Sequence, residues 1–438
     1  MKPKTPDNET DLFRSQLSQI INLEHRLCRL SRQIDWTVFE DEYGALYAAG
    51  GGRPGLPTRL MVGLHYLKYL YNESDESVVD RWLENPYWQY FCGYEYLQHE
   101  LPLHPTSLVK WRQRIGAEKL ELLLKETITC ARRNGALKSR SLTRVNVDTT
   151  VQEKAVAFPT DARLYHKMRV ALVRAAKQRN IRLRQSYHRV GKKALIWQGR
   201  YASARQGKRA RAQQRKLKTY LGRVVRDIRR KHPDPDASLQ ILLHRAERLL
   251  VQQRKDKNKI YSVHAPEVEC IAKGKLHKRY EFGCKASIAT TSAGNWMVGA
   301  QSLPGRPYDG HTLTGALAQV HQLTGHTPKA AFVDQGYRGH KHSGQTQVHV
   351  VGRLPKTATR SFKRWLKRRT AIEPCIGHLK ADHRMTRNHL KGAQGDAINV
   401  ILAAAGYNLA KLLDWIAWLC RILRLVPLNP TKQRLFAS

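Results

Sequence analysis

Three acidic residues stand at positions from which they could share one metal site: Asp148, Asp334 and Glu373. The first two each follow a valine that ends a short strand-like run, and the third lies in a segment with helical spacing. Hard divalent cations such as Mg²⁺ bind carboxylate oxygens together with substrate phosphate oxygens. A carboxylate cluster therefore predicts metal-dependent phosphodiester chemistry. One aspartate after a strand is more often a turn former or a helix cap, so the hypothesis depends on all three.

The rest of the chain is strongly basic. Its 438 residues include 77 Lys and Arg against 35 Asp and Glu, a formal net charge of +42. Such an excess opposes compaction unless a polyanion neutralises it, and each contact with a phosphate also releases counterions. DNA or RNA is the expected partner, and an anionic membrane surface is the other candidate. Because 41% of the residues are hydrophobic, the chain is expected to fold.

The cysteines and the apolar stretches indicate the compartment. None of the seven cysteines is spaced as C-x-x-C, which argues against zinc knuckles and favours reduced thiols. The N-terminus has no signal-peptide core. The most apolar stretch, residues 397–425, is interrupted by Asn, Lys, Asp and Arg, so it predicts a buried helix rather than a membrane span. We expect a cytoplasmic, nucleoid-associated protein that does not enter a membrane.

The first part of the chain, residues 1–140, has helical patterns. Helices are expected after Pro57, after Ser74 as a cap, and from Thr106. The third helix would turn Leu108, Trp111 and Ile115 inward and the candidate DNA contacts Lys110, Arg112 and Arg114 outward. Three short helices with a basic last one are compatible with a helix-turn-helix module. An ordinary helical bundle with a solvated basic face fits the pattern equally well.

The segment 163–261 holds on the order of half of the net charge in under a quarter of the chain. It contains roughly 30 Lys and Arg against about five acidic residues. One interpretation is an unstructured basic linker. The other is a helical arm against a nucleic-acid backbone, with an antiparallel helix pair hinged near Pro233 and Pro235. We favour the arm, because the regularly spaced Leu, Ile and Val residues need something to pack against.

The remaining chain mixes strands with helices. Strands are expected at residues 142–148, 279–291, 295–303, 329–334 and 347–351, with helices from Asp309 and around Glu373. Without the basic segment, Asp148 and Asp334 are separated by only about 90 residues, so we interpret that segment as an insertion into an α/β domain.

The neighbours of Glu373 suggest how an acid site could hold DNA. Arg369, Glu373 and Lys380 are spaced by four and seven residues, which places them on one helix face. The acid could bind metal while the two cations hold phosphates; the alternative is an exposed ladder of salt bridges. Pro374 predicts that the helix either kinks there or restarts with Pro374 in its first turn.

These motifs together resemble those of a known family. The segments VDTT (147–150) and VDQGY (333–337), with Arg369-x3-Glu373-x6-Lys380, resemble the Asp-Asp-Glu (DDE) transposases of bacterial insertion sequences. The stretch RRTAIEPCIGHLKADHRMTRN is similar to the signature block of the "insertion sequence five" family, and SDESVVDRWLENPYWQYFCG is similar to its N-terminal domain. The family pattern has Tyr where this chain has Leu366, with Trp365 adjacent.

The resemblance implies a fold, a reaction and partners. The fold would be α/β, with a ribonuclease-H-like mixed sheet, flanking helices, an all-α N-terminal domain and a basic, mostly helical insertion. The protein would bind terminal inverted repeats, cleave DNA at the element ends and join the 3′ ends to target DNA. Asp148, Asp334 and Glu373 would be the catalytic residues and would ligate two Mg²⁺ or Mn²⁺ ions. Synapsis of two ends of double-stranded DNA implies a homodimer.

The expected domains follow from these boundaries. They are a helical DNA-binding domain (1–140), a catalytic domain (141–162 with 262–426), the basic insertion (163–261) and a tail (427–438). Three other functions stay open: a nuclease of the same fold without strand transfer, a non-enzymatic nucleic-acid-binding protein, and an inactive relic of a transposase.

Overall fold

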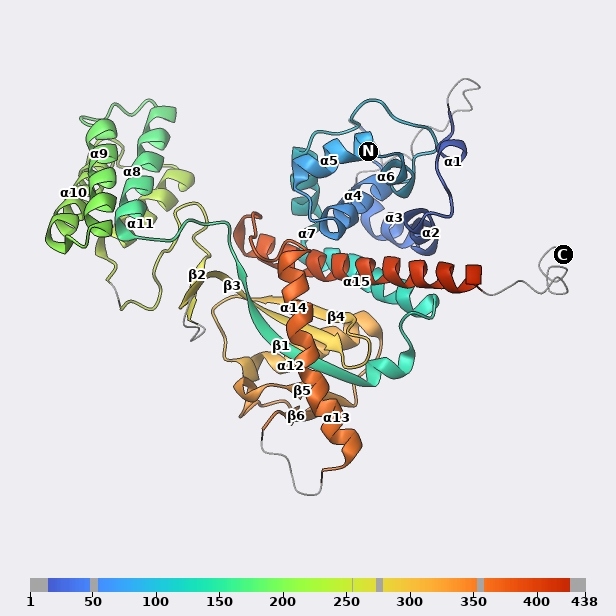
Figure 1. Ribbon diagram of the computed structural model, residues 1–438. Coiled ribbons are helices and arrows are strands. Elements are labelled where there is room, and N and C mark those ends of the chain that lie inside the picture. Colours follow the sequence, from blue (N-terminus) through green and yellow to red (C-terminus); the bar gives the residue numbers. More distant parts are fainter. Residues whose placement is uncertain (1–14, 48–53, 254, 273–278, 353–357, 426–438) are drawn as a thin grey trace, which may run out of the picture. The chain divides into compact units, whose positions relative to one another are not determined.

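The computed structural model describes residues 15–47, 54–253, 255–272, 279–352 and 358–425 (Figure 1). The expected tail, 427–438, lies outside them. The chain forms two compact units. We call Met1–Gln152 with Lys285–Ser438 the discontinuous unit, and Glu153–Cys284 the inserted unit. The finer division into four domains stays a prediction.

The first third of the chain, which belongs to the discontinuous unit, is helical, as predicted. Its helices are α1 (Leu17–Ile20), α2 (Arg26–Gln33), α3 (Thr37–Gly44), α4 (Thr58–Leu70), α5 (Asp75–Glu84), α6 (Pro86–Phe91) and α7 (Thr106–Arg133). Ser74 caps α5: its hydroxyl accepts the Ser77 N–H, and the Ser77 hydroxyl accepts the Ser74 N–H. Gly116 interrupts α7 with a φ of 80°, a conformation that an L side chain rarely adopts. The helix from Thr106 is therefore a short one that continues into a second.

A six-stranded mixed sheet follows. Its strands are β1 (Arg144–Glu153), β2 (Glu269–Ala272), β3 (Tyr280–Thr291), β4 (Met297–Leu303), β5 (Ala330–Val333) and β6 (Gln347–Val350). The strand order is β2-β3-β1-β5-β6, and β4 pairs with β3. The pairs β1–β5 and β5–β6 are parallel, whereas β2–β3 and β3–β4 are antiparallel. These strands confirm the α/β class.

One predicted strand boundary is wrong. The first strand was expected to end at Asp148, but β1 continues to Glu153. The reason is visible in the residues that follow: Thr149, Thr150 and Val151 are β-branched and favour extended backbone. Thr150 and Val151 are buried, so packing also holds the second half of the strand. Asp148 therefore lies in the middle of a strand and not at its end.

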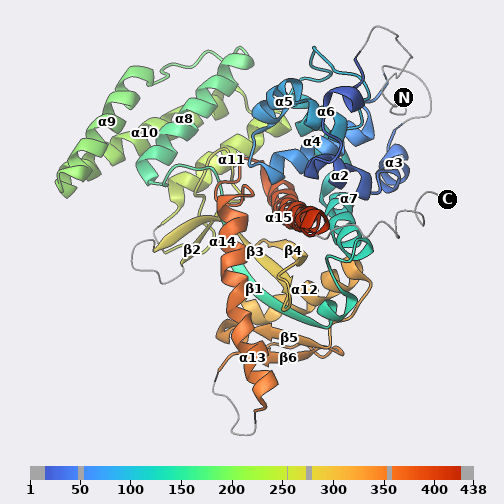
Figure 2. The ribbon, with the colours of Figure 1, turned by 45° about the vertical axis from the view of Figure 1, so that its right-hand side comes forward.

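Four further helices complete the discontinuous unit. They are α12 (Asp309–Thr324), α13 (Arg360–Arg368), α14 (Ile372–Ala381) and α15 (Gly392–Leu425). Figures 1 and 2 show α13 and α14 as a column running across the strands. Helix α12 packs on β4 and α7, and α15 packs on α4, α7 and β4.

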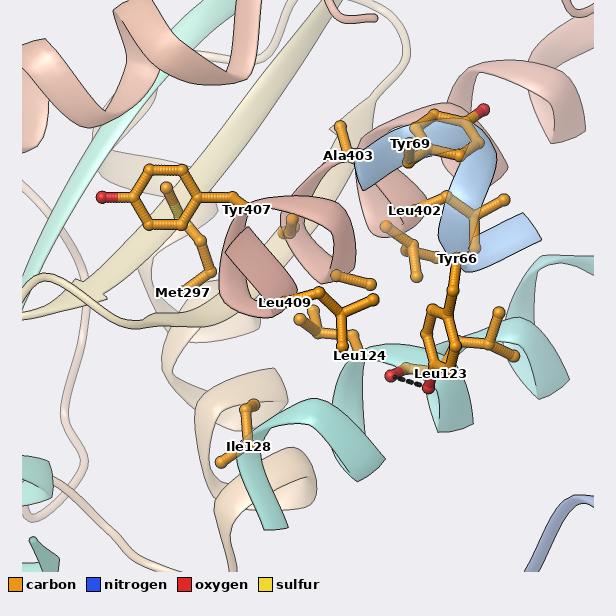
Figure 3. Close-up of a cluster of buried hydrophobic side chains, with 14 of the residues drawn as sticks. Tyr66, Tyr69, Leu123, Leu124, Ile128, Met297, Leu402, Ala403, Tyr407 and Leu409 are labelled. Carbon is orange, nitrogen blue, oxygen red and sulfur yellow. Dashed lines mark hydrogen bonds between the residues drawn. The ribbon is translucent and has the colours of Figure 1, made fainter. Parts of the chain in front are cut away.

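The N-terminal helices and the sheet share one hydrophobic core. Figure 3 shows Tyr66 and Tyr69 of α4, Leu123 of α7, Met297 of β4 and Leu409 of α15 in this core, with the Tyr66 hydroxyl donating to the Leu123 carbonyl at 2.9 Å. A shared core couples the stability of the two parts, so both are expected to unfold together.

Helix α15 confirms the expectation of a buried helix. It is long and apolar enough to cross a membrane, but 72% of its apolar stretch is buried within the protein. Its polar residues bind neighbouring elements: the Asn408 side chain accepts the Met297 N–H and donates to the Met297 carbonyl, each at 2.9 Å. Buried amides with such partners avoid the cost of an unpaired polar group.

The inserted unit contains a helical bundle (Figure 2). Its helices are α8 (Asp161–Gln178), α9 (His188–Ser203), α10 (Gly207–Lys231) and α11 (Ala237–Val251). Leu217, Leu221, Val224 and Ile228 lie on one stripe of α10 and are buried in the core of the bundle. The linker interpretation is therefore wrong. The segment has four helices rather than one pair, and the predicted hinge near Pro233 and Pro235 is the connection between α10 and α11.

Candidate active site

The sheet places the first two acids side by side. In the parallel pairing of β1 with β5, Asn146 lies opposite Phe332. Two residues further along each strand, the same register brings Asp148 opposite Asp334, which directly follows β5. Side chains alternate along a strand, so residues two apart share one face of the sheet. The register thus explains how acids separated by 186 residues come together.

The third acid comes from the helical column. A short 3₁₀ turn, Arg369–Ala371, precedes α14, and Glu373 is in the first turn of that helix. Pro374 is also in the first turn, where its missing N–H costs no intrahelical hydrogen bond. Of the two predictions made from Pro374, the structure confirms that a new helix begins with the proline in its first turn, and not that one helix kinks there.

All three carboxylates surround the guanidinium of Arg369. Nη2 of Arg369 lies 2.8 Å from Oδ2 of Asp148 and 3.7 Å from Oδ2 of Asp334, and Nη1 lies 3.1 Å from Oε1 of Glu373. The Arg369 side chain is 10% exposed, whereas that of Glu373 is 63% exposed. Arg369 lies in the 3₁₀ turn and not in α14 itself, but the contact with Glu373 that the four-residue spacing predicts is present. Arg369 also reaches the two strand acids.

The donor set suits a hard divalent cation, because it consists of carboxylate oxygens. Within the described residues, however, no three His, Cys, Asp or Glu side chains lie as metal ligands would. The guanidinium lies among the carboxylates instead. Its positive charge offsets their mutual repulsion, as a bound cation would.

A buried polar network fixes the start of the Arg369 turn. The Asn146 amide of β1 donates to the Arg368 carbonyl at 3.2 Å and accepts from the Ser292 hydroxyl at 2.7 Å. Nε of Arg368 donates to the Ser292 carbonyl at 2.7 Å. Asn146 and Ser292 are completely buried. These residues position Arg369, and the sequence offered no signal for them because their partners are far apart in the chain.

A fourth carboxylate belongs to the cluster, and sequence reasoning had assigned it only to the start of a helix. Asp309, the first residue of α12, accepts from the Thr149 hydroxyl at 2.7 Å and pairs with Lys285 at 2.5 Å. A Cβ placed on Gly336 would lie 3.1 Å from Oδ2 of Asp309 and 3.1 Å from Oδ1 of Asp334. The missing side chain of Gly336 therefore leaves room for these two carboxylates to approach each other.

Tyr337 is buried close enough to these acids to feel their charges, and it stays protonated. Its side chain is fully buried. Burial, followed by the charges of Asp309, Asp148 and Asp334, raises the pKa of the Tyr337 phenol far above its ordinary value. A phenol that cannot ionise is a poor nucleophile, so Tyr337 is unsuited to a covalent step.

Lys380 and the nearby histidines are less informative. Lys380 is half-buried in the last turn of α14, and its contact with phosphate stays a prediction. Nδ1 of His378 lies 2.7 Å from Oδ2 of Asp382, so that ring pairs with an exposed acid rather than with Glu373. Trp365 is adjacent to Leu366, the residue that stands where the family pattern has Tyr. The guanidinium carbon of Arg144 lies over the Trp365 ring, 4.8 Å from its centroid.

The prediction that Arg112 faces outward is wrong. Arg112 is 3% exposed, and its guanidinium donates to both carboxylate oxygens of Asp75 at 2.8 and 2.6 Å. The reason is helical periodicity: position 112 follows Leu108 by four and precedes Ile115 by three, so it belongs to the buried stripe. Lys110 and Arg114 are exposed, as predicted.

The buried Arg112 is part of an ion cluster with Lys68, whose Nζ lies 2.7 Å from Asp75. Burial alone would raise the pKa of Asp75, but the hydrogen bonds from Arg112 and the charge of Lys68 hold it well below its ordinary value. Both cations are therefore paired inside the protein, and Arg112 stabilises the fold instead of facing DNA.

Comparison with known proteins gives two family matches and one relative. Residues 15–114 match a family described as a transposase domain, and residues 334–413 match one described as a transposase DDE domain. A Rhizobium meliloti protein described as "Uncharacterized protein ORF8 in nfe locus" is 52% identical over 207 residues, which is 47% of this chain and 100% of that protein. No solved structure matches. The chain belongs to the DDE transposases of insertion sequences.

Proposed function

We propose that the protein is a metal-dependent DNA transposase that binds terminal inverted repeats, cleaves DNA at the element ends and joins the 3′ ends to target DNA. The observation that carries this proposal is the convergence of Asp148, Asp334 and Glu373 on one guanidinium. Carboxylates from two neighbouring strands and a facing helix form a site that rigid elements can hold in place. Its proposed partners are double-stranded DNA and, in the DNA complex, a second copy of the chain.

The strand arrangement supports a ribonuclease-H-like fold for this site. The order β4-β3-β1-β5-β6 combines an antiparallel pair, β3–β4, with the parallel pairs β1–β5 and β5–β6. The acids lie on β1, directly after β5 and on a helix that crosses the strands. That is the arrangement that the family resemblance implies for its three catalytic acids.

Two Mg²⁺ or Mn²⁺ ions would be held by Asp148, Asp334 and Glu373. Such ions lower the pKa of bound water and stabilise the leaving 3′ oxygen. The protein's own contribution is to orient the carboxylates and to supply positive charge for phosphate oxygens. Arg369, whose guanidinium lies among the carboxylates, could direct its planar fork of donors toward a phosphate oxygen. Asp309 holds Thr149, the residue next to Asp148, through the 2.7 Å hydrogen bond.

The test is cleavage of DNA that carries the element ends, with Mg²⁺, by Asp148→Asn, Asp334→Asn and Glu373→Gln separately. Each should lower the cleavage rate by at least about 10²- to 10³-fold, as removal of a group that stabilises transition-state charge does. Binding of the ends, measured with Ca²⁺ by gel shift, should persist. The matched control is Asp414→Asn, an exposed acid on α15. Cleavage at the wild-type rate would remove that residue from the site.

The same assay grades the fourth acid. Asp309→Asn should reduce cleavage about 10- to 100-fold, the range typical of groups that position metal ligands. A rate equal to that of Asp414→Asn would show that Asp309 has no positioning role.

Joining separates transposition from its alternatives. Pre-cleaved ends with free 3′-hydroxyls should be joined to target DNA by the wild-type protein. Cleavage without joining would identify a nuclease on the same fold. Binding that leaves DNA intact, with no response to divalent ions, would identify a non-enzymatic nucleic-acid-binding protein or an inactive relic.

A further inference from the structure

The inserted unit has an arginine-lined pocket of about 250 Å³. One wall is the segment that precedes α9, and the other is a face of α10. Its lining includes Arg184, Tyr187, Arg223, Arg226, Asp227 and Arg230. Because Arg223, Arg226 and Arg230 are spaced by three and four residues, they lie on the same face of α10. We call this site the arginine pocket.

The pocket carries a local excess of positive charge. Arg230 donates to Asp227 at 2.5 Å. Arg184, Arg223 and Arg226 are exposed, and within the part of the chain that the structure describes their guanidinium groups pair with no carboxylate. Guanidinium groups bind phosphate oxygens through charge-assisted, often bidentate hydrogen bonds. Three such groups around one hollow are therefore suited to an anion with several oxygens.

The walls of the arginine pocket are fixed in advance. Asp227, whose side chain is 9% exposed, accepts the backbone N–H of Arg184 at 2.7 Å and so holds the segment before α9 against α10. The Tyr187 ring stacks on Tyr220 with a centroid distance of 4.6 Å and an interplanar angle of 11°. A site whose walls are already ordered loses little conformational entropy when a ligand binds.

A buried cation lies behind the same wall. Arg169 of α8 is 2% exposed and donates to the carbonyl of Ser186, whose neighbours Gln185 and Tyr187 line the pocket. Among the described residues, Nε and Nη2 of Arg169 have no hydrogen-bond partner. Arg169 therefore adds a buried positive charge behind this wall and holds the wall through Ser186.

We propose that the arginine pocket binds a backbone phosphate of DNA and so fixes the inserted unit to the duplex at one point. The identity of the nucleic acid rests on the proposed function, whereas the preference for phosphate comes from the pocket itself. Contacts with phosphates position a protein on DNA without reading its sequence. The pocket should therefore contribute equally to binding of element ends and of unrelated duplexes.

The test compares two charge-matched double variants of the full-length protein. Arg223→Gln with Arg226→Gln removes two pocket guanidiniums. Arg174→Gln with Arg215→Gln removes two exposed arginines of the same bundle that do not line the pocket. Binding to a fluorescent duplex without element ends is measured by anisotropy over a range of salt concentrations, with EDTA present.

The pocket variant should bind at least about tenfold more weakly, because hydrogen bonds to charged groups are among the strong ones. The slope of log affinity against log salt should fall by about 0.9 for the lost phosphate contact. The control variant should change both quantities much less. Equal losses in the two variants would show that net charge alone is responsible, and would overturn the proposal.

Asp227→Ala separates pocket geometry from charge. Removing a negative charge should tighten DNA binding if attraction is merely general. If the pocket binds phosphate, releasing the Arg184 segment should weaken binding instead, with the bundle still helical by circular dichroism. Tighter or unchanged binding by Asp227→Ala would refute the preformed pocket.

These outcomes are independent of the catalytic proposal. The binding assay contains no divalent ions, so Asp148→Asn should retain the full salt slope. Acid variants that still cleave DNA would defeat the proposed function and leave the slope unchanged. Equal slopes for the pocket and control variants would defeat the pocket and leave the acid requirement unchanged.

Discussion

The acid cluster of the discontinuous unit and the arginine pocket of the inserted unit are opposite arrangements of charge. In the first, the guanidinium of Arg369 lies among carboxylates. In the second, the carboxylate of Asp227 lies among guanidinium groups. A net charge of +42 would not by itself indicate a site for cations. We therefore expect local composition, and not net charge, to decide which ligand each surface attracts.

The two arrangements also differ in burial. The Arg369 and Asp148 side chains are 10% and 14% exposed, whereas Arg223 and Arg226 are exposed. Charges interact more strongly where water is excluded. Substitutions among buried charges of the discontinuous unit should therefore change the free energy of unfolding. Substitutions among exposed charges of the inserted unit should change DNA binding instead.

The largest effect on stability is expected at the buried ion cluster of the discontinuous unit. Asp75→Asn leaves Lys68 and Arg112, which are 4% and 3% exposed, without their carboxylate. Breaking a buried pair by removing one partner costs about 3–5 kcal/mol. Urea unfolding should show this loss, while Asp80→Asn, an exposed acid on the same helix, should change little. Similar values for the two variants would show that burial does not set the strength of these ion pairs.

Acid should weaken the same cluster in the wild-type protein. His65 also belongs to this cluster, because its Nε2 lies 3.1 Å from Nη1 of Arg112. Burial, then the charge of Arg112, lowers the pKa of His65 to about 3. Below its ordinary pKa of about 6.5, the unfolded chain binds a proton at this histidine that the folded chain does not. Stability should therefore fall as the pH drops from about 6.5 toward 3. The pKa of the Asp75 carboxyl is depressed in the folded protein, so its charge stabilises the fold at pH values above the ordinary pKa of an aspartate. This stability is lost in turn as the pH falls below that ordinary pKa.

An intermediate effect is expected for Arg369→Gln. Without the guanidinium, the three carboxylates repel each other, and the free energy of unfolding should fall by about 1–3 kcal/mol. Ca²⁺ should restore much of this loss, because a divalent cation can take the place of the guanidinium. Scanning fluorimetry with Ca²⁺ and with EDTA should give a larger Ca²⁺-dependent rise in Tm for Arg369→Gln than for the wild type. The control is Lys363→Gln, which removes an exposed cation on α13. Equal Ca²⁺-dependent rises in Tm for the wild type and both variants would contradict the idea that Ca²⁺ can replace the guanidinium.

The local parts of this site could be predicted from the sequence. Strand-like runs ending in valine indicated β1 and β5, and the four-residue spacing indicated the contact between Arg369 and Glu373, which is 3.1 Å. Such features depend on neighbours in the chain. The contact between Arg369 and Asp148 joins residues 221 positions apart and depends on strand register, which no local pattern specifies.

The wrong predictions have two origins. The run before Asp148 predicts a strand end there, but the β-branched residues that follow it extend β1. The charge of Arg112 predicts exposure, but its spacing from Leu108 and Ile115 places it on the buried stripe of the helix. Local pattern therefore contained the answer in both cases. The surroundings of Asp309 depend instead on packing past Gly336, which no local pattern specifies.

The smallest effect should come from an ion pair of the inserted unit. Arg229 of α10 and Glu247 of α11 lie 3.0 Å apart, with side chains 31% and 41% exposed. Exposed pairs are screened by water and salt, so Glu247→Gln should change the free energy of unfolding by less than about 1 kcal/mol. The variant also removes a negative charge from a basic unit, and DNA binding should tighten slightly. Asp227→Ala removes the same charge but should weaken binding, because only Asp227 holds a wall of the arginine pocket. If both variants changed DNA affinity in the same direction, Asp227 would have no role in the arginine pocket beyond its charge, just as Glu247 has none.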